Sequence, residues 1–86
     1  MQFIPGMIVK SDAGRDQPGY YVVIAVEDGF VYIADGRRRK VEKPKRKNPR
    51  HLKATKTVVG SMEIDTNQKL RRVLRGYQET AAPVAE

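Results

Sequence analysis

A basic stretch between positions 37 and 56 contains the side chains of this 86-residue chain that are best suited to bind a ligand. Residues 37–57 hold eleven lysines and arginines and one acidic residue, Glu42, for a net charge of +10. Residues 1–36 carry a net charge of −3, and residues 58–86 are neutral overall. Such concentrated charge repels itself unless a polyanion neutralises it. The stretch therefore predicts a nucleic acid or an anionic membrane surface as partner.

A simpler interpretation is a solvated charge run that only keeps the protein in solution. Charges of mixed sign serve that purpose better, whereas here eleven positive charges accompany one negative charge. We therefore favour nucleic acid over this interpretation. Because nucleic acid is also the commonest partner of such concentrated charge, we predict no membrane partner. The side chains predicted to contact the phosphates of RNA or DNA are Lys10, Arg15, Arg37, Arg38, Arg39, Lys40, Lys43, Lys45, Arg46, Lys47, Arg50, His51 and Lys53.

The residues that could support catalysis or bind a metal are few and scattered. His51 is the only histidine and there is no cysteine, so a set of metal ligands does not form. A catalytic histidine would also need a positioned nucleophile or carboxylate. Four aspartates fall in predicted turns, where aspartate accepts local backbone hydrogen bonds: Asp12, Asp16, Asp28 and Asp35. The sequence therefore predicts no catalytic residue, no metal and no cofactor, although a small RNA-cleaving enzyme stays an alternative.

The cellular compartment follows from composition. The absence of cysteine argues against the disulfide-rich secreted class. No apolar run approaches the roughly 20 residues of a membrane helix, and the first residues lack the order of a signal peptide. We expect a cytoplasmic protein.

The elements that must position the basic side chains begin with β structure. Residues 3–10 predict a first strand, and the glycines and proline of 11–19 predict a loop. The β-branched and aromatic run at 20–26 is typical of a strand buried on both faces. The turn signal at 27–29 joins it to a returning strand at 30–34. The aromatic residues of this hairpin are candidates either for stacking on bases or for the core: Tyr20, Tyr21, Phe30 and Tyr32.

The basic stretch itself follows this hairpin. Residues 37–43 fit a strand or a loop. Two prolines make 45–50 extended or irregular, and we expect this part to be a flexible arm that orders on RNA. A last strand is predicted at 51–58. Because no helix separates the strands, the pattern predicts a small, mainly β barrel of about five strands.

A C-terminal helix completes the predicted domain. Asp65 and Gln68 have the spacing of a capping box. An apolar stripe at helical spacing follows, made of Leu70, Val73, Leu74 and Tyr77. The arginines of this helix either extend the RNA contact or face water. The predicted organisation is a barrel at 1–58 with a basic arm at 37–50, a linker and helix at 59–79, and a disordered tail at 80–86.

The first two predicted strands resemble a KOW motif, with strands at Met7–Lys10 and Tyr20–Val26 and Gly14 as the motif's loop glycine. From residue 4 to residue 57 the chain resembles the fourteen-e large-subunit ribosomal proteins of archaea and eukaryotes. The residues that carry this likeness are Gly14-Arg15, Gly19-Tyr20, Val22-Val23, Phe30-Val31, Asp35-Gly36, Arg37-Arg38-Arg39-Lys40 and Lys47-Asn48-Pro49-Arg50-His51-Leu52. Thr66-Asn67-Gln68-Lys69-Leu70-Arg71-Arg72 resembles the end of small bacterial KOW proteins related to that family.

This resemblance implies an SH3-like barrel with ribosomal RNA as its ligand, association with the ribosome or translation, and no enzyme activity. The chain differs from the family in its acidic first third, with Asp12 and Asp16 in the loop that carries Gly14. SH3-like and KOW modules also bind proteins in transcription and translation. A protein-interaction module, with contacts through the barrel or the helix, is therefore the alternative function.

Overall fold

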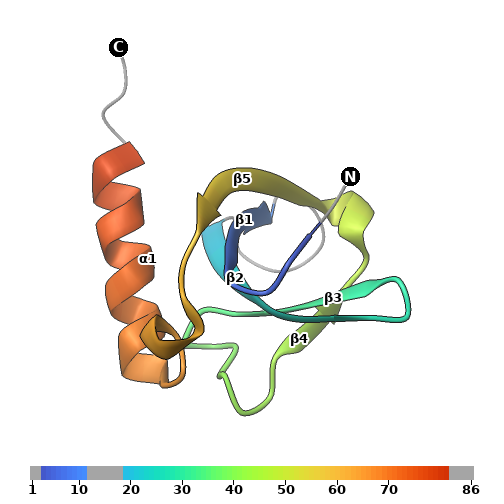
Figure 1. The fold of residues 1–86 in the computed structure, drawn as a ribbon, viewed down its shortest axis with the longest axis horizontal. Coiled ribbons are helices and arrows are strands. Elements are labelled where there is room, and N and C mark those ends of the chain that lie inside the picture. The colour runs from blue at the N-terminus through green and yellow to red at the C-terminus, as the bar shows by residue number, and fades with distance from the viewer. Residues whose placement is uncertain (1–2, 12–18, 82–86) are drawn as a thin grey trace.

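The described residues form five strands and one α-helix, which confirms the predicted mainly β fold (Figure 1). The computed structural model describes residues 3–11 and 19–81, with side chains as far as position 77. The strands are β1 (Met7–Ser11), β2 (Gly19–Glu27), β3 (Phe30–Ala34), β4 (Lys45–Lys47) and β5 (Leu52–Val58), and the helix is α1 (Asn67–Ala81). Short 3-10 turns at Pro49–His51 and Ser61–Glu63 lie before and after β5.

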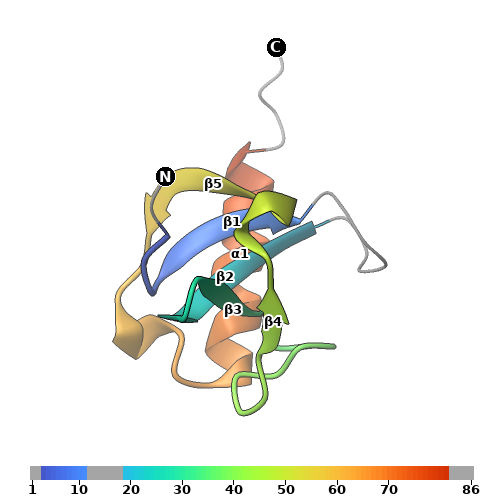
Figure 2. The same ribbon diagram turned by 90° about the vertical axis from the view of Figure 1, so that its right-hand side faces the viewer.

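All neighbouring strands are antiparallel, and their order in the sheet is β4-β3-β2-β1-β5. Because β1 lies between β2 and β5, the chain must return across the molecule to add its last strand. Figures 1 and 2 show β5 arching over one side of the molecule, with β3 and β4 on the opposite side. The sheet is therefore an SH3-like barrel that stays open between β4 and β5.

The predicted hairpin of β2 and β3 is confirmed, including its turn. Asp28 and Gly29 have positive φ angles of 50° and 81°. Two positive φ angles in a two-residue loop match the right-handed twist of the flanking strands. The register then places Glu27 opposite Phe30. Part of the other predicted loop, residues 12–18 with Arg15, Asp12, Asp16 and Gly14, lies outside the described residues.

The middle of the apolar run in β2 is buried on both faces, as predicted, because each face meets a separate core, whereas Val26 near its end is exposed. One core lies between the sheet and α1 and contains Ile8, Val22, Ala34, Ile64, Leu70 and Leu74. The other fills the barrel and contains Val9, Tyr21, Val23, Val31, Ile33 and Leu52. Neighbours in sequence such as Val22 and Val23 alternate between the two, as the period of a strand requires. The barrel and the helix are thus one packed unit.

The second half of the basic stretch differs from the predicted flexible arm. Lys45–Lys47 is extended, but it forms β4 and pairs with β3, with Arg46 opposite Tyr32. The prolines that suggested an irregular segment stand just outside this strand, so neither removes a hydrogen bond from it. After β4, Asn48 caps the 3-10 turn, because its Oδ1 accepts a hydrogen bond from the N–H of Arg50 at 3.0 Å. The pairing of β4 with β3 and the capped 3-10 turn therefore give this segment a folded structure.

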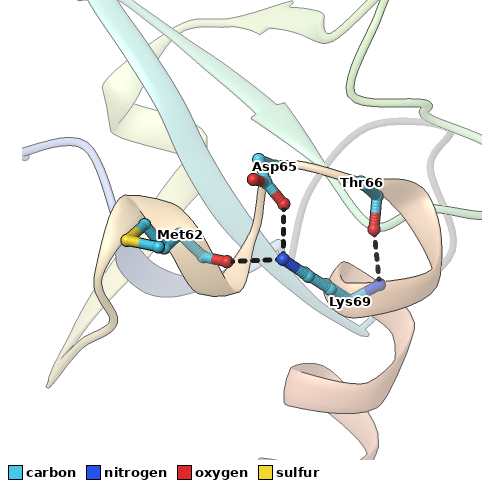
Figure 3. Close-up of polar contacts among 4 residues, drawn as sticks. All are labelled: Met62, Asp65, Thr66 and Lys69. Atoms are coloured by element: carbon cyan, nitrogen blue, oxygen red, sulfur yellow. Dashed lines mark hydrogen bonds and ion pairs between the residues drawn. The ribbon is translucent and has the colours of Figure 1, made fainter.

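Helix α1 begins one residue later than predicted. The side chain of Thr66, and not that of Asp65, caps it: the N–H of Lys69 donates to Thr66 Oγ1 at 3.2 Å (Figure 3). Asp65 instead forms an ion pair with Lys69 Nζ at 3.0 Å. The predicted apolar stripe is confirmed, with Leu70 fully buried. The helix continues to Ala81, so it includes the first two residues of the predicted tail, and residues 82–86 lie outside the described part.

No helix in the ranges that the structure covers is long and apolar enough to cross a bilayer.

Candidate nucleic-acid interface

The segment between β3 and β4 begins with a turn built around the Asp35 carboxylate. Asp35 Oδ1 accepts hydrogen bonds from the N–H groups of Arg37 at 2.9 Å and Arg39 at 3.0 Å. The carbonyl oxygen of Arg39 in turn accepts hydrogen bonds from the N–H groups of Asp35 and Gly36. The predicted turn role of Asp35 is therefore confirmed. Because its backbone closes inward on a carboxylate, the turn fixes the backbone of three consecutive arginines, of which Arg37 and Arg38 are exposed.

Beyond this turn the chain surrounds an open hollow of about 410 Å³, which we call the loop hollow. Its lining residues are Arg38, Arg39, Lys40, Lys43, Pro44, Lys45 and Arg46. A second turn, in which the N–H of Lys43 donates to the carbonyl of Lys40 at 3.0 Å, brings the two halves of this segment together. Six of the predicted RNA contacts thus gather at one place, and no carboxylate belongs to this lining within the described residues.

Glu42 is the only acidic residue of the basic stretch, and α1 engages its carboxylate. Asn67 Nδ2 donates to the two carboxylate oxygens at 2.9 Å and 3.3 Å, while Asn67 Oδ1 accepts from the N–H of Val41 at 2.7 Å. The Asn67 hydrogen bond is the main cause that lowers the pKa of Glu42, followed by a backbone hydrogen bond and the charge of Lys40. Glu42 is therefore ionised at neutral pH, but its carboxylate binds the helix and does not line the loop hollow.

The aromatic candidates have different positions. Arg46 lies over the ring of Phe30, 4.6 Å from its centroid, which is a cation–π contact. Tyr21 belongs to the barrel core, so its ring does not offer a stacking surface. Tyr20 packs edge-on against Tyr77 of α1, with centroids 5.0 Å apart. Tyr32 is half-buried in β3, opposite Arg46. Of the four rings, Phe30 is therefore the one in contact with a cation of the loop hollow.

The remaining predicted contacts in the described part of the chain do not line the loop hollow. Lys47 is buried, with only 7% of its surface exposed. Arg50 and His51 are exposed on the 3-10 turn before β5. Lys10 and Lys53 are exposed and stand opposite each other on β1 and β5. Like charges directly opposite on a sheet disfavour folding, and this pair does not line the loop hollow.

Arg37 points to a different place from its neighbour Arg38. It lines a hollow of about 280 Å³ together with residues of α1, which we call the helix hollow: Arg37, Gln68, Arg71, Arg72 and Arg75. Arg71 is anchored there, because its Nη1 donates to the carbonyl of Gly36 at 2.8 Å. The sequence left the role of the helix arginines open and did not indicate that they meet Arg37. The proximity of Arg37 to these arginines depends on how α1 packs on the sheet. No local sequence pattern predicts that packing.

In the part of the chain that the structure covers, no three histidine or carboxylate side chains gather in a group able to hold a metal ion. Comparison with known proteins adds no relative, since neither a family model nor a curated protein matches the chain.

Proposed function

We propose that this protein binds RNA and that the loop hollow is its main contact with the phosphate backbone. The observation that carries the proposal is the gathering of six lysine and arginine side chains around one open hollow, with the nearby carboxylate of Glu42 engaged by Asn67. Phosphate is the natural counter-charge, because a guanidinium offers it two parallel hydrogen bonds. The lining contains no asparagine or glutamine suited to read bases, so recognition rests on backbone charge and shape.

Structured ribosomal RNA is the proposed target, and a role at the ribosome or in translation is the proposed context. Support comes from the resemblance of residues 4–57 to the fourteen-e ribosomal proteins and their KOW motif. The open SH3-like barrel is the architecture that this resemblance implies. Both arguments concern the same segment, because the cluster from Arg37 to Lys40 carries the resemblance and also contributes to the hollow.

The test is binding of ribosomal RNA over a salt series from 50 to 200 mM. If the six side chains of the loop hollow contact phosphates, they contribute about −4 to −5 to the slope of log affinity against log salt. Affinity that does not respond to salt, or no binding at low salt, contradicts the proposal. Sedimentation of the tagged protein with ribosomal subunits, against unrelated structured RNA as competitor, tests the ribosomal target separately.

A protein partner is the second candidate function. The observation in its favour is a mainly apolar hollow of about 230 Å³, lined in part by Pro5, Ile24, Val41, Val59 and Ile64. Partner capture that survives nuclease treatment favours this function. Capture that disappears with the nucleic acid favours RNA binding. RNA that stays intact after long incubation with the protein and magnesium is the result expected for a protein that is not a nuclease.

A further inference from the structure

The four cations of α1 fall into two groups with different surroundings. Lys69 is engaged on one side: its Nζ contacts the carboxylate of Asp65 and the carbonyl of Met62, both at 3.0 Å (Figure 3). The arginines at 71, 72 and 75 line the helix hollow on another side, where the lining holds no carboxylate among the described residues. The lysine of α1 is therefore engaged by residues just before the helix, whereas three arginines line one hollow together.

This gathering of arginines has an energetic cost in the absence of a ligand. Arg71 and Arg75 are four residues apart on the helix, and Arg72 and Arg75 are three apart. Like charges at these spacings destabilise a helix. Arg37 adds a fourth guanidinium from a different element. A bound anion removes this repulsion, and a phosphate group matches the forked geometry of the arginines.

The helix hollow is already assembled, because three contacts join α1 to the segment after β3. Arg71 donates to the Gly36 carbonyl, and Asn67 binds both the N–H of Val41 and the carboxylate of Glu42. Gly36 itself lies so close to the helix that a Cβ there would be 2.5 Å from the carbonyl oxygen of Asn67. Figure 1 shows the chain after β3 reaching the start of α1 before it turns back toward β4. Binding of an anion therefore requires the arginine side chains to be ordered but does not require α1 and the segment after β3 to be brought together.

A neighbouring hollow of about 250 Å³ shares Arg37, Arg71 and Arg75 and adds Asp35, Tyr20 and Leu74. Among the described lining residues the Asp35 carboxylate is the one negative group, and its Oδ1 already accepts two backbone hydrogen bonds. The three shared arginines therefore border a surface that continues along the junction of the sheet and the helix. Such an extended cationic surface suits a chain of phosphates better than a single small anion.

We propose that the helix hollow is a second phosphate-binding site for the same RNA that occupies the loop hollow, an inference that rests on the proposed RNA binding. Arg37 and Arg38 are consecutive in one turn but line different hollows, so the two sites adjoin at this turn. A polyanion that covers the turn meets both. The RNA contact then extends from the β3–β4 segment onto the exposed face of α1.

The experiment compares Arg72→Ala, Arg75→Ala and the double variant with wild type in ribosomal RNA binding between 50 and 200 mM salt. Both side chains are exposed, and neither takes part in the contacts that join α1 to the sheet. Each single change should make the logarithmic salt slope shallower by about 0.7 to 0.9, and the double change by about twice that amount. Lys56→Ala on β5 is the control, because it removes one exposed positive charge outside both hollows.

The outcomes separate the two proposals. A slope that changes with the α1 variants and not with Lys56→Ala supports the second site. If the α1 variants behave like Lys56→Ala while wild type binds with a steep slope, the second site is wrong and RNA binding through the loop hollow stands. If wild type does not bind RNA at low salt, the proposed function itself is wrong. A further variant, Arg72→Lys with Arg75→Lys, should keep the salt slope and lose affinity several-fold, since lysine lacks the fork.

Discussion

The loop hollow and the helix hollow contain similar side chains but are built in opposite ways. The loop hollow is lined by residues from a single segment between positions 38 and 46. The helix hollow joins Arg37 to arginines more than thirty positions later. The first needs only two turns and a short strand, whereas the second needs α1 held in place against the sheet. The clustering of charge in the sequence therefore predicts the loop hollow. It does not predict the helix hollow, whose residues are far apart in the sequence.

The first way to sharpen this comparison is to remove charge from the loop hollow alone. Arg38, Lys40 and Lys43 are exposed, and Arg38→Ala, Lys40→Ala and Lys43→Ala together remove half of its six cations. Loss of three phosphate contacts lowers RNA affinity by about 10- to 100-fold at 0.1 M salt and makes the salt slope shallower by about 2 to 3. Filter binding or fluorescence anisotropy measures both quantities.

This loss should exceed that of the two α1 substitutions, because three contacts are removed and not two. Unfolding in urea provides the control, since exposed side chains outside the core leave stability nearly unchanged. A triple variant that binds RNA as wild type does would show that the loop hollow is not the main contact.

A second way to compare the two hollows is to displace α1 from the segment after β3 without changing any charge. Gly36 has a φ of 82°, and a Cβ there would meet Asn67 and Leu70. Gly36→Ala should lower the free energy of unfolding by about 2–4 kcal/mol, because strain of the left-handed backbone adds to the cost of overpacking. It should also weaken RNA binding through the displaced helix hollow.

Gly29→Ala is the matched control for this change. Gly29 has a similar φ of 81°, but a Cβ there meets no atom within 4 Å. Its cost should be the backbone strain alone, about 1–2 kcal/mol. Equal destabilisation by the two alanines in urea unfolding would contradict the close approach of α1 at Gly36.

The smallest expected effect concerns pH and the Glu42–Asn67 contact. The pKa of Glu42 lies below its ordinary value of 4.5, chiefly because of the Asn67 hydrogen bond. A carboxyl whose pKa is lower in the folded state stabilises that state above the ordinary pKa, and this contribution disappears as pH falls through the folded value. Wild type should therefore lose a small increment of stability below about pH 4.5 that Glu42→Gln does not lose.

Asn67→Ala tests the same contact from the other side. NMR titration of Glu42 should show its pKa rise toward the ordinary value, because the main cause of the shift is removed. The variant should also lose about 1–3 kcal/mol of stability, since the half-buried N–H of Val41 loses its acceptor. An unchanged Glu42 pKa in this variant would show that Asn67 does not hold the carboxylate.

Much of the fold could be predicted from local patterns. The Asp28-Gly29 turn, the doubly apolar run of β2 and the stripe from Leu70 to Tyr77 are all present as expected. The wrong predictions concern positions where the local sequence allows two structures equally well. Asp65 and Thr66 are both good caps, and only the path of the chain into α1 selects Thr66. Lys45–Lys47 has no apolar residue that would indicate a strand. It becomes β4 because it pairs with the otherwise open edge of β3.

The sequence by itself determined that the excess positive charge is concentrated in one segment and that strands and an amphipathic helix surround it. Hydrophobic periodicity and turn residues act over a few neighbouring positions, so they predict the same strands and helix in any arrangement of these elements. Only the tertiary structure decided that Asn67 binds Glu42, and that Arg37 faces the helix while Arg38 faces the loop hollow. These contacts arise because burial of Leu70 and Leu74 against the sheet fixes where α1 lies. The direction of a surface arginine then follows from packing of the core beneath it.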